Sequence, residues 1–89
     1  MNNEKRCWEL MRACRTMKKE DEKFILESCE ILKGLSEDEL SEECDLTVGE
    51  GIRAHSIIWM CGEYFKSSGE DREMWKEDII HAAIDFFEY

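Results

Sequence analysis

The apolar residues of this 89-residue chain recur at spacings of three and four, and no segment keeps the period of two that a strand requires. The chain has no proline, so only its five glycines interrupt helix formation. Short polar stretches separate the apolar stripes. The pattern predicts an all-α fold, a small bundle of four to five helices that forms a single domain over residues 1–89.

The first two helices are expected at residues 4–19 and about 24–32. The first would turn inward the stripe Cys7, Leu10 or Met11, Cys14 and Met17. The second would bury Phe24 or Ile25, Ser28 or Cys29, and Ile31 or Leu32, with Leu35 beyond it. One continuous helix is the alternative, but the polar run 18–23 favours a break near residue 20. Asp21 would then cap the second helix, and Lys33 with Gly34 would end it.

Two S/T-x-x-E capping boxes mark the next two helix starts. Ser36 with Glu39 predicts a short helix at about 37–44 that has only Leu40 and Cys44 to bury. Thr47 with Glu50 predicts a long helix at about 48–67. Its inner face would hold Ile52, His55, Ile58, Trp59, Gly62 and Phe65, and would be widened by Ile57, Cys61 and Tyr64. A last helix is expected at about 71–88, with the inner stripe Met74 or Trp75, Ile79, Ala82 or Ala83, and Phe86.

The central pair of helices has the outline of a helix-turn-helix, in which the second helix enters the major groove of DNA. Here the turn residue would be Asp45, where glycine is usual. The start of the second helix offers a single base, Arg53, although phosphate contacts usually need several. The residues therefore favour a protein that has the architecture of a helix-turn-helix but does not bind nucleic acid directly.

Charge is the second constraint on function. Twelve Lys and Arg oppose twenty-two Asp and Glu, which gives a net charge of −10. Residues 1–23 carry seven bases and five acids, and residues 24–89 carry five bases and seventeen acids. Such a field repels nucleic acid and anionic membranes and attracts basic protein surfaces. The simpler alternative is that the excess charge only keeps a small protein soluble.

The acids concentrate in residues 36–50, which contain no Lys or Arg. They are Glu37, Asp38, Glu39, Glu42, Glu43, Asp45 and Glu50. Six of them fall within nine positions, roughly one charge per 2 Å of helix axis, close to the ~1.7 Å of duplex DNA. The helix dipole favours acids in the first turn but not in the last. These seven residues are the candidate partner-binding site, as an acidic surface or as a mimic of nucleic acid.

Other chemistries find little support in the sequence. Five irregularly spaced cysteines form no disulfide framework and no zinc motif, so we expect reduced, buried thiols and no metal or cofactor. His81 has Glu77 and Asp85 one turn away, but the helix supplies no nucleophile. His55 would be a core residue. No enzyme activity is expected. The absence of a signal peptide and of a long apolar window predicts a cytoplasmic protein without a membrane partner.

The C-terminal stretch IIHAAIDFFEY is apolar around much more than the usual third of a helix. Either this helix is central in the core, with Phe87 and Tyr89 packed on the N-terminal helix, or part of it is the seam of a homodimer.

Together these features favour an acidic interaction module that inhibits a partner protein by docking on its basic, nucleic-acid-binding surface. A small acidic helical protein from a phage or mobile element, acting against a CRISPR effector, would fit this description. One alternative is a degenerate or dimeric helix-turn-helix transcriptional regulator, whose N-terminal bases Lys5, Arg6, Arg12, Arg15, Lys18 and Lys19 would touch phosphates. Another is a non-catalytic subunit of a larger assembly, which would expose apolar surface when isolated.

Overall fold

A computed structural model describes residues 1–88, which form five α-helices and no strand. The α-helices are α1 (Asn3–Cys14), α2 (Glu22–Leu32), α3 (Glu37–Glu43), α4 (Val48–Lys66) and α5 (Gly69–Glu88). A short 3₁₀ helix, η1 (Lys19–Asp21), precedes α2. The predicted all-α bundle is therefore confirmed, including the short helix and the long helix of its central pair.

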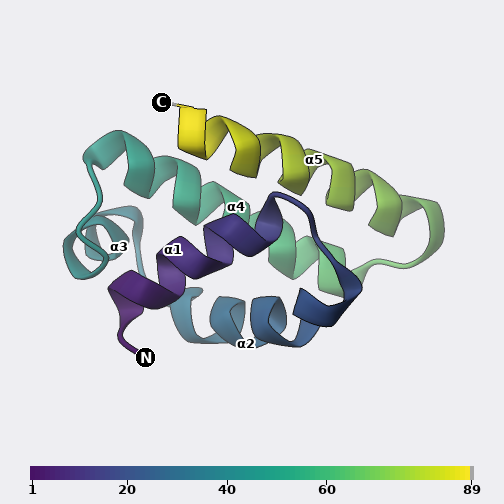
Figure 1. Ribbon diagram of the computed structural model, residues 1–89, viewed down its shortest axis with the longest axis horizontal. Helices are drawn as coiled ribbons and strands as arrows, with labels where there is room; N and C mark the ends of the chain where they lie inside the picture. Colours follow the sequence, from purple (N-terminus) through teal and green to yellow (C-terminus); the bar gives the residue numbers. More distant parts are fainter. Residues whose placement is uncertain (89) are drawn as a thin grey trace.

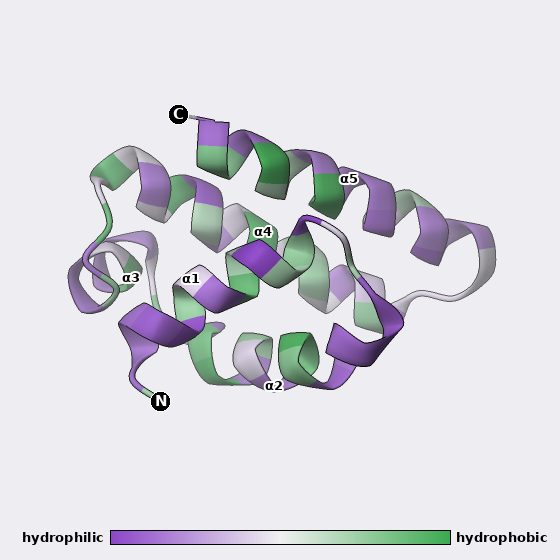
Figure 2. Cartoon of the chain, viewed as in Figure 1, coloured by the Kyte–Doolittle hydropathy of each residue, from purple (hydrophilic) through white to green (hydrophobic). Residues whose placement is uncertain are grey.

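The bundle is organised around α4, which contacts each of the other four α-helices. In Figure 1, α1 crosses in front of α4, α2 and α5 lie along opposite sides, and α3 closes one end. Figure 2 shows hydrophilic residues over most of α3, the start of α1 and the η1 segment. No helix in the described part of the chain is both long and apolar enough to cross a membrane.

The first helix is shorter than predicted, because it ends at Cys14 instead of residue 19. Met17 adopts a left-handed conformation with φ of 49°, and its N–H donates to the carbonyl of Ala13, 2.9 Å away. This geometry ends a helix and still leaves the Met17 side chain buried. The break itself was predicted. Asp21 occupies the N-cap position of α2 as expected, but its side chain makes no capping hydrogen bond.

Both predicted capping boxes are present. The Ser36 hydroxyl accepts from the Glu39 N–H at 3.2 Å, and the Glu39 carboxylate accepts from the Ser36 N–H at 3.0 Å. The Thr47 and Glu50 pair repeats the arrangement at 3.2 Å and 2.9 Å. Each box satisfies two backbone donors that a helix start leaves without partners. The caps therefore fix where α3 and α4 begin.

The turn between α3 and α4 is tight. Asp45 has φ of 53°, which confirms it as the left-handed turn residue, and the Leu46 N–H donates to the Ser41 carbonyl at 2.9 Å. α3 then lies so close to α4 that a Cβ at Gly51 would collide with the Ser41 hydroxyl and lie 3.2 Å from the Glu37 carbonyl oxygen. Only glycine permits this approach.

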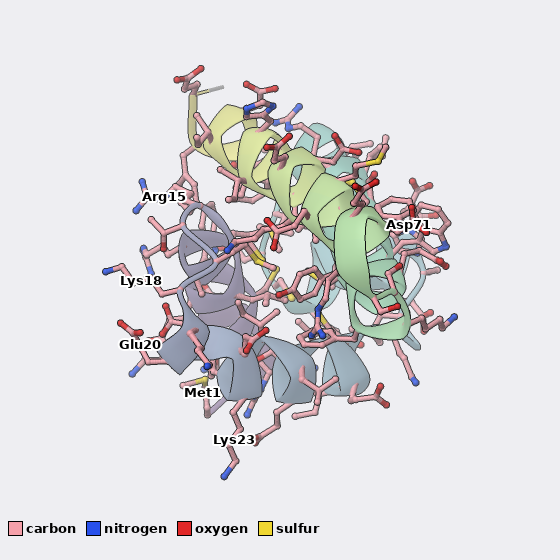
Figure 3. The ribbon with its side chains drawn as sticks, turned by 90° about the vertical axis from the view of Figure 1, so that its right-hand side faces the viewer. Met1, Arg15, Lys18, Glu20, Lys23 and Asp71 are labelled. Carbon is pink, nitrogen blue, oxygen red and sulfur yellow. The ribbon has the colours of Figure 1, made fainter. Side chains whose placement is uncertain are left out.

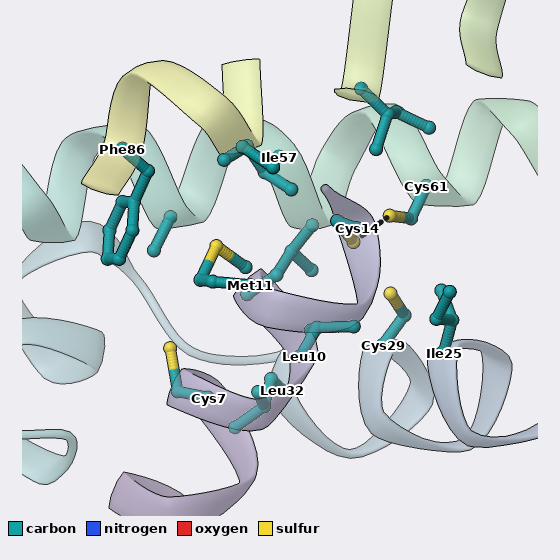
Figure 4. Close-up of a cluster of buried hydrophobic side chains, with 14 of the residues drawn as sticks. Cys7, Leu10, Met11, Cys14, Ile25, Cys29, Leu32, Ile57, Cys61 and Phe86 are labelled. Atoms are coloured by element: carbon teal, nitrogen blue, oxygen red, sulfur yellow. Dashed lines mark hydrogen bonds between the residues drawn. The ribbon is translucent and has the colours of Figure 1, made fainter. Parts of the chain in front are cut away.

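All five α-helices contribute to one hydrophobic core (Figure 4). Leu10, Ile25, Leu40, Ile57 and Phe86, one from each helix, are fully buried. All five cysteines are free and buried among them, as the sequence predicted. The one buried polar side chain among the described residues is Ser28, and its hydroxyl accepts a hydrogen bond of 3.0 Å from the Arg6 guanidinium.

The prediction for the inner face of α4 was partly wrong. Ile58 is buried as expected, but 48% of Ile52 and 58% of Trp59 are exposed. Ile57, Cys61 and Tyr64, which were expected only to widen the inner face, are buried and form the inner stripe with Gly51, Ala54 and Ile58. The physical reason is that α4 carries two apolar stripes. The stripe with the small residues faces inward because it lets α3 and α1 approach closely.

The last helix follows its predicted stripe at Ile79, Ala83 and Phe86, whereas Met74 is exposed. Its aromatic end packs on α1. The Trp8 ring lies 5.3 Å from that of Phe86 and 6.0 Å from that of Phe87, and the Arg15 guanidinium lies 4.6 Å from the centre of the Phe87 ring. The core alternative is confirmed for Phe87, and Tyr89 lies outside the described residues.

Candidate functional site

The acidic helix α3 turns Leu40 into the core and directs its acids elsewhere. Asp38 and Glu42 are four residues apart and share a face. Leu40 lies two residues from each, about 200° round the helix, so this face points away from the core. Glu37 lies on the edge next to Gly51 of α4. The acids therefore surround the exposed part of α3 instead of sharing one face.

Three of the seven candidate acids have partners within the chain. Glu39 and Glu50 belong to the two capping boxes. Glu43 accepts a hydrogen bond of 2.9 Å from the side-chain amide of Asn3 in α1. Hydrogen bonds from the Ser36 N–H and then from its hydroxyl lower the pKa of Glu39. These three acids hold α3 and the start of α4 in place.

The other four acids, Glu37, Asp38, Glu42 and Asp45, are exposed. Because the chain has no Lys or Arg from residue 34 to residue 52, their charges add to a local negative field. Asp38 and Glu42 share the outer face, and Asp45 follows in the turn. A single partner surface can therefore meet two or three of these charges at once. The even spacing of the acids along the sequence implies that a partner would meet more charges than this.

The acidic segment is held rigidly. The buried side chains of Leu40 and Cys44 anchor α3, and the Cys44 thiol lies 3.4 Å from the carbonyl oxygen of Asn3, to which it donates. The Ser41 hydroxyl donates to the Thr47 carbonyl at 3.4 Å across the turn. Groups that are already fixed lose little conformational entropy on binding. The acids are thus presented by a preorganised support.

Some of the N-terminal bases contact other side chains of the fold, and others extend into solvent. Arg6 donates to Ser28, and Arg15 stacks on Phe87, so these two guanidinium groups support the fold. Figure 3 shows Arg15, Lys18 and Lys23 at the edge of the molecule, on the opposite side from Asp71. A hollow of about 660 Å³ lies near the end of α1 and mixes bases with acids. Its lining is Glu9, Arg12, Ala13, Arg15, Thr16, Lys18, Asp21 and Phe24.

The thiols form contacts in the core but are poor nucleophiles. The Sγ atoms of Cys14 and Cys61 lie 3.7 Å apart (Figure 4). Burial, with a contribution from Cys44, raises the pKa of Cys7 to about 12. Hydrogen bonding to Cys61 and burial raise the pKa of Cys29. Since the thiolate is the reactive form, these groups stay inert near neutral pH.

No metal site is apparent in the described residues, where no three His, Cys, Asp or Glu side chains are grouped to hold an ion. His55 is half-buried on α4, and His81 is exposed on α5. Nothing in the arrangement of residues 1–88 pairs either imidazole with a hydroxyl or thiol nucleophile.

The sequence reasoning missed an exposed apolar surface on α4. Val48 (71% exposed), Ile52 and Trp59 project outward, and the Trp59 ring lies 5.6 Å from that of Trp75 in α5. Beside Trp59, a groove of about 270 Å³ runs between α2 and α4. It is lined by Leu26, Cys29, Glu30, Lys33, Ile58, Trp59, Gly62, Glu63, Phe65 and Lys66. The available signal was a second stripe of apolar residues in α4.

Comparisons of the chain with protein-family models, with curated proteins and with solved structures found no match.

Proposed function

We propose that this protein is a non-catalytic interaction module, and that its acidic α3 segment docks on a basic, nucleic-acid-binding surface of a partner protein. The observation that carries the proposal is the rigid presentation of Asp38, Glu42 and Asp45. These three acids are exposed in a stretch without bases, on a helix that both capping boxes and the Leu40 anchor hold in place. Such a surface attracts a basic groove and repels nucleic acid.

The proposed mechanism is competition. A partner whose basic groove holds DNA or RNA would be occupied by α3, and its nucleic acid would be excluded by charge and by the volume of the bundle. Such an inhibitor would suit a phage or mobile element that blocks a defence system, and a CRISPR effector is one candidate target. The charge complementarity mainly increases the association rate, so salt should weaken the binding.

The architecture offers less support for a transcriptional regulator. In a helix-turn-helix the second helix must be free to enter a groove. Here the exposed face of α4 is apolar, with Val48, Ile52 and Trp59, and Arg53 is the only Lys or Arg in its first three turns. Two of the N-terminal bases, Arg6 and Arg15, are engaged with Ser28 and Phe87. A DNA-reading role would therefore rest on four other exposed N-terminal bases, Lys5, Arg12, Lys18 and Lys19, and not on the helix that should enter the groove.

The proposal is tested by capturing partners from bacterial lysate at low salt on immobilised protein, with and without nuclease. We expect a basic nucleic-acid-binding protein that stays bound after nuclease treatment and elutes at high salt. Adding that purified partner to its own nucleic-acid substrate should then show that the module displaces the substrate. Recovery of DNA itself, lost on nuclease treatment, would contradict the proposal and favour the regulator.

A further inference from the structure

The exposed stripe of α4 has a regular spacing. Residues 48, 52, 55, 59, 62 and 66 follow one another at intervals of four, three, four, three and four, which is the pattern of a helix–helix seam. These positions are Val48, Ile52, His55, Trp59, Gly62 and Lys66. All six are exposed or half-buried, and Val48, Ile52 and Trp59 are large apolar side chains in contact with water. Within the chain, Trp59 packs on the Trp75 ring at one edge of this seam, and the other large apolar side chains, Val48 and Ile52, stay exposed.

The two ends of this seam are complementary. Its N-terminal end is large, apolar and next to acids, with Val48 and Ile52 directly after the base-free segment. Its C-terminal end has Gly62, which carries no side chain, and then Lys66, whose charge is paired with Glu63. A Cβ placed on Gly62 would meet no atom within 4 Å, so the space above this glycine is open. A second seam laid antiparallel on the first would place its large side chains over the open space at Gly62.

We propose that the occupant of this seam is a second copy of the same chain, paired antiparallel through α4. With position 57 at the centre, Ile52 of each copy lies over Gly62 of the other, and Trp59 lies beside His55 of the other. Lys66 then approaches the start of the other α4, where Glu50 and the α3 acids lie. The helix dipoles also oppose one another, which is favourable.

The groove between α2 and α4 provides the socket for this pairing. Gly62 and Trp59 line it, together with Leu26 from α2. Its rim carries two ion pairs, Lys33 with Glu30 at 2.8 Å and Lys66 with Glu63 at 3.9 Å. Each pair sums to zero charge, so the rim of this groove is neutral in a chain of net charge −10. An uncharged side chain such as Ile52 of the second copy suits this socket better than a basic partner does.

This dimer differs from the one that the C-terminal stretch suggested, because Phe86 and Phe87 already pack on Trp8. It also leaves the outer face of α3 open, since Asp38 and Glu42 lie outside the seam. The inference is therefore independent of the proposed function. A dimer would carry two acidic segments at opposite ends of the paired helices.

The test is cross-linking by engineered cysteines, combined with sedimentation equilibrium of the unmodified chain. Ile52→Cys and Gly62→Cys are at exposed or open positions and should fold, which circular dichroism checks. Two copies of position 52 would lie ten residues apart along the pair, about 15 Å, too far for a disulfide. Position 52 would lie opposite position 62. We expect a mixture of the two variants to form a disulfide-linked heterodimer, and neither variant alone to cross-link.

Sedimentation of the unmodified chain should show a concentration-dependent dimer. Ile52→Glu should raise its dissociation constant at least about tenfold, since the charge would be buried in an apolar socket. Ile84→Glu, on an exposed part of α5, is the matched control and should leave it unchanged. A monomer at every concentration would overturn the inference. So would cross-linking of Ile52→Cys with itself, which indicates a parallel pair, or a dimer that the Ile84 variant weakens more.

Discussion

The Sγ atoms of Cys14 and Cys61 lie 3.7 Å apart and join α1 to α4 in the centre of the core. In Figure 4 the thiol of Cys29 points toward this pair from α2. Three helices thus meet through three small, polarisable side chains. Cysteine packs here as a small hydrophobic residue with a weak hydrogen-bonding group. This explains why five cysteines without a recognisable spacing are compatible with an ordinary helical core.

Stability should fall as pH rises above about 9, because burial raises the pKa of Cys7 to about 12 and also raises that of Cys44. Hydrogen bonding to Cys61 raises the pKa of Cys29, and hydrogen bonding to Cys14 raises the pKa of Cys61. The unfolded chain then loses thiol protons that the folded chain keeps. The stabilisation is complete when the pH is below the thiol pKa of the unfolded chain. It is lost as the pH rises toward the thiol pKa values of the folded chain. Urea unfolding at neutral pH and at about pH 10 measures the change, and equal stabilities would contradict it.

Two glycines of α4 should respond to alanine with opposite signs. Gly51→Ala should lower the free energy of unfolding by about 1–2 kcal/mol, because the collision with Ser41 outweighs the gain in helix propensity. Gly62→Ala meets open space and should raise it by up to about 1 kcal/mol. Chemical denaturation at low protein concentration, with the two variants side by side, makes the comparison. If both variants changed the free energy of unfolding in the same direction, the close packing of α3 on α4 described above would be contradicted.

The caps should be needed for both stability and presentation of the acids. Ser36→Ala and Thr47→Ala should each cost about 1 kcal/mol, since each removes the side-chain acceptor of one capping box. Hydrogen exchange should show faster opening of α3 in the Ser36 variant, because α3 has only seven residues and a single buried side chain. Ser56→Ala, at an exposed position in the middle of α4 where it caps no helix start, is the control. Unchanged exchange in α3 would count against the role of this cap.

A polar network at the edge of the core should also contribute. The Tyr64 hydroxyl donates to the Glu22 carboxylate at 2.9 Å, and the Arg72 guanidinium lies 3.5 Å from the same oxygen and 4.5 Å from the Tyr64 ring centre. Tyr64→Phe should cost about 1–2 kcal/mol, because it removes a hydrogen bond to a charged acceptor. Repeating it in a Glu22→Ala background, which removes the acceptor, completes a double-mutant cycle. A coupling free energy near zero would mean that this bond contributes nothing to stability.

The features that sequence predicted well were local ones. The capping boxes of Ser36 and Thr47 depend on four consecutive residues, so they could be placed without knowledge of the fold. The inward face of α3 followed from Leu40 for the same reason. The choice between the two stripes of α4 was not local. It depends on how closely α3 can approach Gly51, which only the packed structure reveals.

In the acidic site, too, the local features could be predicted from the sequence and the long-range contacts could not. Its seven residues could be named from composition, and the capping roles of Glu39 and Glu50 from their spacing. The contact between Glu43 and Asn3 joins positions forty residues apart and could not be predicted. The exposed apolar seam was missed because Ile52 and Trp59 were assigned to the core. An apolar residue in a helix has no local mark that distinguishes a core face from a binding face.

The central claim is that the outer acids of α3 bind a basic protein surface, and association kinetics with the captured partner test it most directly. The triple variant Asp38→Asn, Glu42→Gln and Asp45→Asn removes three charges, and asparagine still tolerates the left-handed turn at position 45. Its control, Glu77→Gln, Asp78→Asn and Asp85→Asn, removes three exposed charges from α5. We predict that the α3 variant associates at least about tenfold more slowly with a shallower salt dependence, while the α5 variant behaves nearly as the unmodified protein. Equal effects of the two variants, or no effect of the α3 variant, would contradict the account.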